Sequence, residues 1–334
     1  MRGFGRRPQT QRAGCSPSMN LKSTAKARFL LHSTATGGAL LMLASAFLFA
    51  VLDGLIKLLG PPFRIWDIAF YRFAGGLAIL VLIIGRNHNP FAGHNRKLLI
   101  IRGITGSCAF LALVTAIRLI PISTALVLFF SFPAFAAFFS PLFFKEPITG
   151  AEIVSVVIAL VGVALLFDFR LQGGLLGQAM AVLGGAFAGL TVGIIKKLRE
   201  KNGPVVIYLY FCLLGSAISF PAFIAHPQIP QVTSEWLMLG GIVCSALAAQ
   251  LLMNQGFRYC KSWEGGLFLM AEVVFTSILG ILFLGEPVTW RFLTGGFLVL
   301  GSAVALNRGN ARRISYRGIP GEKQAISKNL SIPS

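Results

Sequence analysis

The chain alternates between long apolar stretches and short breaks rich in Gly, Pro and polar residues. Each stretch has about the 17–25 residues that a helix needs to cross a bilayer. Lipid offers no partner to an open sheet edge, so every stretch is expected to be helical. The pattern predicts an all-α integral membrane protein with ten transmembrane helices, at 38–59, 66–85, 98–117, 121–144, 148–167, 175–195, 204–225, 236–257, 263–284 and 290–306.

Two of the breaks share a sequence. "LFFKEPIT" at 142–149 recurs as "LFLGEPVT" at 282–289, and the same shift places "VVIALVGVALL" (156–166) on "GFLVLGSAVAL" (296–306). We therefore predict one five-helix unit written twice. The expected organisation is a basic, disordered cytoplasmic tail, two repeats and a second basic cytoplasmic tail, at 1–35, 36–167, 174–306 and 307–334.

Five is an odd number, so the second repeat is expected to enter the membrane from the opposite side. Cytoplasmic loops carry an excess of Lys and Arg. If both tails face one side, most of the 30 Lys and Arg residues fall there, and Lys57, Arg72 and Arg102 lie within or at the edge of spans. The other side holds Arg64, Arg118, Arg170 and Arg291. The charge pattern predicts that both termini are cytoplasmic.

Composition agrees with a membrane protein. The chain is 55% hydrophobic and 12% charged, with a mean hydropathy of +0.75, whereas soluble domains carry about 25% charged residues. The net charge of +19 lies in tails and loops, so it indicates orientation and not nucleic-acid binding. The dispersed cysteines and histidines predict no metal site or cofactor. A phosphate-binding loop and hydrolase motifs are missing from the sequence, so neither an ATP-driven pump nor an enzyme is expected.

The doubled turn resembles a known family. "AEVVFTSILGILFLGEP" at 271–287, "FYRF" at 70–73, and Pro133 placed before Glu146 are similar to the EamA family of the drug/metabolite transporter superfamily. The resemblance covers both repeats and implies a ten-helix inner-membrane carrier for small metabolites, driven by exchange or an ion gradient. The second repeat departs from the first in having Val273 at the position of Pro133, which leaves the local helix geometry open.

Charges inside spans are costly, by about 2.5–3.5 kcal/mol on insertion scales, so each one needs a reason. Glu272 lies in the middle of the ninth span and matches an acidic position that the resemblance implies for substrate or proton binding; the alternative is a structural partner for a buried Arg, Ser or Thr. Asp53 and Lys57 are one helical turn apart and can pair locally or line a cavity. Arg72 can reach the interface, neutralise Asp67, or bind a substrate carboxylate.

Other motifs are expected to be structural. Glu146, Pro147, Glu286 and Pro287 form the two turns, where Pro begins a helix that needs no N–H there. The ridge of Gly185, Gly189 and Gly193 suits close helix packing.

Inverted repeats are typical of alternating-access carriers. The hypothesis is a secondary transporter that moves a small polar or zwitterionic metabolite, such as an amino acid, outward across the cytoplasmic membrane. Alternatives are uptake or exchange of S-adenosylmethionine or of another nucleoside-like or vitamin compound, and a membrane scaffold or sensor without transport. The expected partners are the substrate, the lipid bilayer, and a proton or counter-substrate; a monomer suffices.

Overall fold

The computed structural model describes residues 21–60, 62–84, 91–166, 173–284 and 289–317. Within these ranges all regular secondary structure is helical. The elements are α1 (Leu21–Leu59), α2 (Ile65–Ile84), α3 (Arg96–Leu119), α4 (Ile122–Phe129), α5 (Phe132–Phe139), η1 (Ser140–Phe144), α6 (Gly150–Leu166), α7 (Leu175–Leu198), α8 (Pro204–Ala225), α9 (Thr233–Gly256), α10 (Ser262–Leu269), α11 (Ala271–Leu284) and α12 (Trp290–Arg317).

The described helices follow the ten apolar stretches. Eight helical segments are long and apolar enough to cross a membrane, and two shorter apolar helices are Gly150–Leu166 and Trp290–Ala305. The outer helices are longer than expected, since α1 begins at Leu21 and α12 ends at Arg317. Part of each predicted tail is therefore helical, because Ala, Leu, Lys and Arg are strong helix formers.

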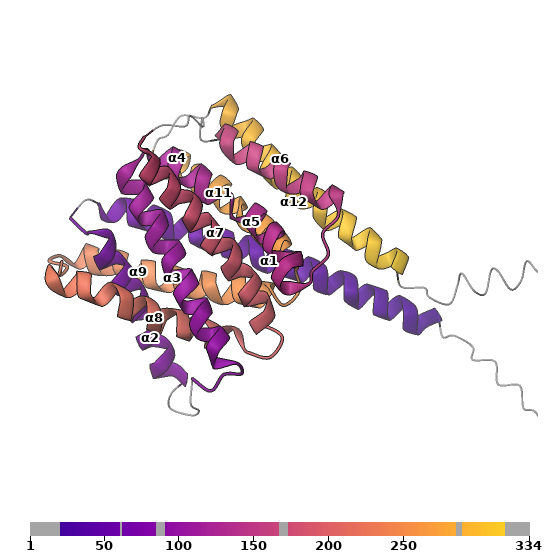
Figure 1. The fold of residues 1–334 in the computed structure, drawn as a ribbon, viewed down its shortest axis with the longest axis horizontal. Coiled ribbons are helices and arrows are strands. Elements are labelled where there is room, and N and C mark those ends of the chain that lie inside the picture. Colours follow the sequence, from indigo (N-terminus) through magenta and orange to yellow (C-terminus); the bar gives the residue numbers. More distant parts are fainter. Residues whose placement is uncertain (1–20, 61, 85–90, 167–172, 285–288, 318–334) are drawn as a thin grey trace, which may run out of the picture.

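Helix pairing follows the two repeats. α3 packs on α7 as α9 packs on α1, and α5 packs on α7 as α11 packs on α1. α2 packs on α8, and α6 lies beside α12 at one edge of the bundle (Figure 1). These pairings are the ones that a two-fold axis relating the repeats would produce, with α2–α8 and α6–α12 on the axis.

One end of the bundle, here called the tail end, gathers the loops at 91–95, 145–149, 199–203 and 257–261. The His94 N–H donates to Asn202 (2.7 Å), and the Lys261 Nζ donates to the Pro147 carbonyl (3.2 Å). The α1 backbone at Gly38 lies against Tyr259. The described lysines and arginines concentrate at this end; those in its loops are Lys145, Arg199, Lys201, Arg258 and Lys261.

Both repeats contain a broken helix at equivalent positions. α4 and α5 are separated at Phe130–Ser131, and α10 and α11 at Met270. Pro133 explains the first break, because it lacks an N–H and favours the start of a helix. The second break occurs with Val273 at that position. The open question about local geometry is therefore answered: the break is kept without the proline.

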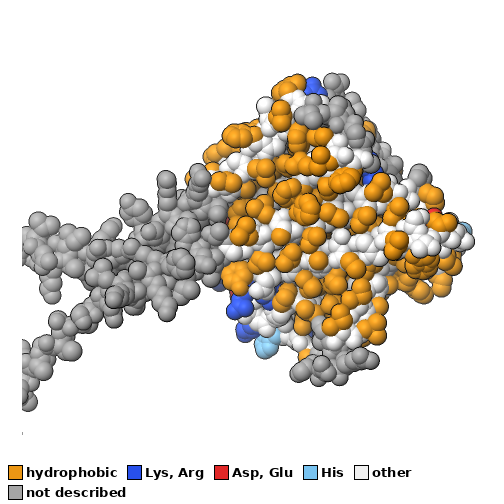
Figure 2. Space-filling model, turned by 180° about the vertical axis from the view of Figure 1, so that it is seen from behind, with side chains coloured by type: hydrophobic (Ala, Val, Ile, Leu, Met, Phe, Trp, Pro, Cys, Tyr) orange, Lys and Arg blue, Asp and Glu red, His pale blue; other side chains and the backbone are white. Residues whose placement is uncertain are grey.

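The outer surface is apolar. Large hydrophobic side chains such as Leu82, Phe143 and Phe297 are well exposed. Figure 2 shows one face almost covered by hydrophobic side chains, with the few visible charges at its margins. Such a surface is matched to lipid.

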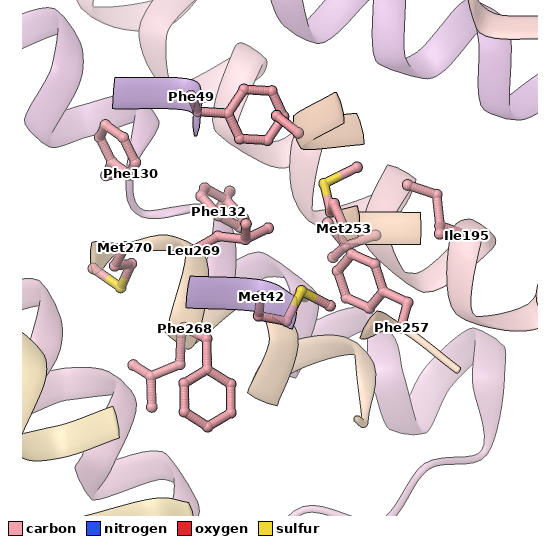
Figure 3. Packing of buried hydrophobic residues seen from close by; sticks show 14 of the residues in the cluster. Met42, Phe49, Phe130, Phe132, Ile195, Met253, Phe257, Phe268, Leu269 and Met270 are labelled. Atoms are coloured by element: carbon pink, nitrogen blue, oxygen red, sulfur yellow. The ribbon is translucent and has the colours of Figure 1, made fainter. Parts of the chain in front are cut away.

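Fully buried side chains gather near the tail end. Met42 and Phe257 lie side by side in Figure 3, and both are fully buried. All of α10 is buried, whereas α11 contains partly exposed positions such as Ile278 and Leu282. α10, which is nearer the tail end, is thus enclosed by protein, whereas α11 is partly exposed.

The glycines of α7 face the first repeat. Gly185 lies against the Phe129 carbonyl, Gly189 against α5, and Gly193 against the Phe144 ring. A Cβ at Gly189 would stand 2.6 Å from the Phe135 Cβ and 2.8 Å from the Phe132 carbonyl oxygen. Since those atoms belong to helix backbone or are fixed to it, the repeats approach each other only because this position lacks a side chain.

We expect Gly189→Ala to lower stability by about 1–3 kcal/mol, because overpacking must push α5 away from α7. The measurement is the thermal unfolding midpoint of purified protein in detergent. Gly240→Ala is the matched control: it also lies in a helix, but nothing stands within 4 Å of its added Cβ. Equal midpoints for the two variants would contradict the close contact at Gly189.

Candidate functional site

The acidic residue predicted in the ninth span lies at the helix break. Glu272 is in the first turn of α11, two residues after Met270. α1 packs directly against α11 and brings Asp53 to the same place. Arg72 approaches from α2. Three residues that are distant in sequence therefore meet inside the bundle.

The two carboxyl groups contact each other. The Asp53 and Glu272 carboxyl groups lie close to each other, and Arg72 is close enough to interact electrostatically with both. Two carboxylates this close repel each other when both are charged, and the apolar interior strengthens the repulsion, so the pair is expected to hold one proton. With one proton on the pair, Arg72 balances the remaining negative charge. The cluster can hold and release a proton, or exchange it for a cationic group.

Aromatic rings fix Arg72 in place. Its guanidinium carbon lies 5.6 Å from the centroid of the Phe73 ring and 5.3 Å from that of Phe110. These distances are typical of cation–π contacts. Arg72 is only 6% exposed, so it does not extend to the membrane interface. Its neighbours include the two rings and the acidic pair.

Access to the acidic pair is partial. Asp53 and Glu272 are surrounded by protein, yet each keeps some exposed surface, in contrast to the buried α10 just before them. A separate cavity of about 190 Å³ lies at the tail end, lined by residues that include His94, Lys197 and Asn202. None of Asp53, Arg72 and Glu272 lines that cavity. The candidate site is therefore supported by the charges of these three residues and not by a cavity.

Two other predicted partners are placed differently. Lys57 lies one turn beyond Asp53 on α1, and its side chain is exposed. Asp67 accepts hydrogen bonds from Arg64 Nε (3.0 Å) and Nη2 (2.9 Å). These bonds raise the pKa of Arg64, and they show that Asp67 is neutralised by Arg64 and not by Arg72. Arg72 is thereby left to the acidic pair.

The first Glu-Pro turn joins the two repeats at the tail end. Glu146 accepts a hydrogen bond from the Ser262 N–H (3.0 Å), at the start of α10. Lys261 pairs with Glu152 of α6 (3.2 Å). These four residues are called the tail-end clasp below. Lys145, with φ 56°, reverses the chain just before the turn. The second turn, Glu286 and Pro287, lies outside the described residues.

Sequence reasoning left out one buried charge. Arg102 of α3 is 1% exposed, and its Nη2 donates to Gln250 Oε1 of α9 (3.2 Å). Its guanidinium lies 4.1 Å from the centroid of the Phe211 ring on α8. The sequence places Arg102 within or at the edge of a span and indicates no role for it. The nearby glycines Gly103 and Gly106 are the feature of the sequence that indicates space for the Arg102 side chain inside the bundle.

Family models provide an independent comparison. The model of the EamA-like transporter family matches residues 36–168 and 175–308, one copy for each repeat. The chain belongs to the EamA-like transporter family. Transporters are among its relatives, which is consistent with a protein that is not an enzyme.

Individual relatives are distant. The pseudopaline exporter CntI of Pseudomonas aeruginosa is 24% identical over 272 residues, covering 81% of this chain and 96% of the relative. Human solute carrier family 35 member G1 is 23% identical, covering 80% of this chain and 78% of the relative. A solved crystal structure has a TM-score of 0.71 at 18% identity, covering 84% of this chain and 99% of that one. This EamA-like chain is therefore a multi-pass membrane transporter with a small-molecule substrate.

We expect Lys261→Gln to destabilise the protein by about 1–3 kcal/mol, because Glu152 is 3% exposed and would lose a charged partner. Thermal unfolding in detergent measures the change. Lys197→Gln is the control, since its pair with Glu200 is more than half exposed on both sides and such pairs contribute about 0–1 kcal/mol. An equal or smaller effect at Lys261 would show that the clasp does not hold the repeats together.

Proposed function

We propose that this chain is a secondary active transporter that moves a small polar or zwitterionic metabolite across the cytoplasmic membrane by alternating access. The observation that carries the proposal is the Asp53–Glu272 pair beside Arg72, inside an apolar bundle and next to the irregular turn at Met270. Carriers built from inverted repeats bind substrates and coupling ions near the middle of the membrane, where the two repeats meet.

The proposed topology is ten passes in two inverted five-helix repeats with both termini in the cytoplasm. The support is the concentration of Lys and Arg at the tail end, since positive loops remain on the cytoplasmic side. The two shorter helices α6 and α12 complete the count. The apolar segments Gly150–Leu166 and Trp290–Ala305 are only about 16–17 residues long, at the lower limit for crossing.

Alternating access requires one end to close while the other opens. The tail-end clasp and the fully buried α10 support a conformation that is closed at the tail end. With the tails in the cytoplasm, that conformation faces outward. A proton on the acidic pair then exchanges with the opposite compartment, and the clasp must separate before the cytoplasmic side opens.

Export is the direction proposed, since an exporter is among the relatives. The substrate class follows from the charges of the site. The acidic pair attracts a cationic group, and the positive charge of Arg72 weakens the binding of substrates that carry only positive charge. Amino acids and similar zwitterions satisfy both conditions. S-adenosylmethionine fits the same chemistry and is tested beside them.

Flux in proteoliposomes tests the proposal. Labelled amino acids, S-adenosylmethionine, riboflavin and organic cations are offered with and without a proton gradient. We expect Glu272→Gln to lower transport of the accepted compound about tenfold or more, equivalent to ~1.4 kcal/mol. Glutamine keeps the size of the side chain but carries no titratable proton. Asp53→Asn is expected to remove the dependence on the gradient.

Glu200→Gln is the control, because it removes a carboxylate that is exposed at the tail end. Normal flux in folded Glu272→Gln would assign Glu272 a structural role and leave transport standing. If wild-type protein moves no compound of the panel under any gradient, the proposed carrier function is wrong for these substrate classes.

A further inference from the structure

Arg102 is directed into the bundle. It lies six residues after the start of α3, about 9 Å from the tail end at 1.5 Å per residue. Long helical side chains normally point back toward the N-terminus, which here would lead to the interface. The Arg102 guanidinium instead occupies the space over Gly106, one turn further inside. Its charge is therefore held within the membrane-spanning part.

The guanidinium has unused donors. Nη2 bonds to Gln250, whereas Nε and Nη1 have no hydrogen-bond partner in the described structure. The groups that act on Arg102 electrostatically are Cys212, Tyr208 and Arg72. The first two are neutral near pH 7, and Arg72 is positive. Arg102 is thus a buried cation without a carboxylate partner, and arginine does not lose its proton.

An aromatic bridge connects Arg102 to the acidic pair. The Phe211 ring under Arg102 makes an edge contact with Phe73 at 4.9 Å between centroids. Phe73 and Phe110 in turn contact Arg72, which interacts with Asp53 and Glu272. The rings therefore lie between a site for a negative group, at Arg102, and a site for a positive group, at Asp53 and Glu272. The bridge joins α3, α8 and α2 to α1 and α11.

We propose that Arg102 binds the carboxylate of a zwitterionic substrate whose cationic group is taken by Asp53 and Glu272. This inference rests on the proposed transport function. Guanidinium and carboxylate match in geometry and charge, and in a low-dielectric interior such an ion pair is strong. Because Arg102 is covered here by α8 and α9, the substrate carboxylate reaches it when α3 separates from them during the transport cycle.

Paired probes test the inference. Each pair is a labelled amino acid and the amine that lacks its carboxylate: lysine and cadaverine, histidine and histamine, S-adenosylmethionine and its decarboxylated form. We expect wild-type protein to move the carboxylate-bearing member at least about tenfold faster. Arg102→Gln is expected to reduce that ratio to about one while the amine still moves, and Arg102→Lys to give an intermediate ratio.

A second variant separates binding from folding. Gln250→Glu places a carboxylate against Arg102 from within the protein, so the protein stays folded and the carboxylate preference is lost. Gln255→Glu is the matched control: it makes the same change on α9, next to Arg199 at the tail end (2.6 Å), and is expected to keep the preference.

The inference is overturned if wild-type protein moves the amines as fast as the amino acids, or if folded Gln250→Glu retains the preference. In either case transport itself is still observed. An absence of flux for every probe is a different result, because it removes the proposed carrier function together with the inference that depends on it.

Discussion

Lipid supplies no hydrogen bonds, so every polar group inside this bundle must find its partner within the protein. Backbone groups meet this requirement by forming helices. Some charged side chains meet it in pairs: Arg64 with Asp67 and Lys261 with Glu152 at the ends of the bundle, and Asp53 with Glu272 inside it. Arg102 meets it only in part, through Gln250 and the face of Phe211. The clasp and the proposed binding site are both built from charged side chains whose partners come from other helices.

The two repeats share a scaffold and differ in their chemistry. Their helices pair in two-fold fashion and break at equivalent positions. The position equivalent to Glu272 is Phe132, and the positions equivalent to Lys261 and Glu152 are Pro121 and Phe292. Neither the central carboxylate nor the clasp ion pair can therefore exist in both halves. Duplication explains the architecture, and divergence explains why these charged positions have no charged counterpart in the other repeat.

This asymmetry matters for alternating access. A symmetric pair of gates would make the two facing states nearly equal in free energy. A clasp at one end favours closure there, and a ligand can change the balance only by binding one state better than the other. A substrate that joins Arg102 to the acidic pair would interact with α1, α2, α3 and α11 together, so its binding would depend on how those helices are placed.

Hydrophobicity is a local property that adds up along the chain, so the sequence by itself determined the apolar stretches, the doubled unit and Glu272 as a buried charge. The tertiary structure decided which partners meet: Asp67 with Arg64, Asp53 with Glu272, and a helix break at Met270 without a proline. It also decided that Arg102 points inward over Gly106 and not toward the interface. Such choices depend on neighbours contributed by other helices, and no periodicity within one helix can reveal them.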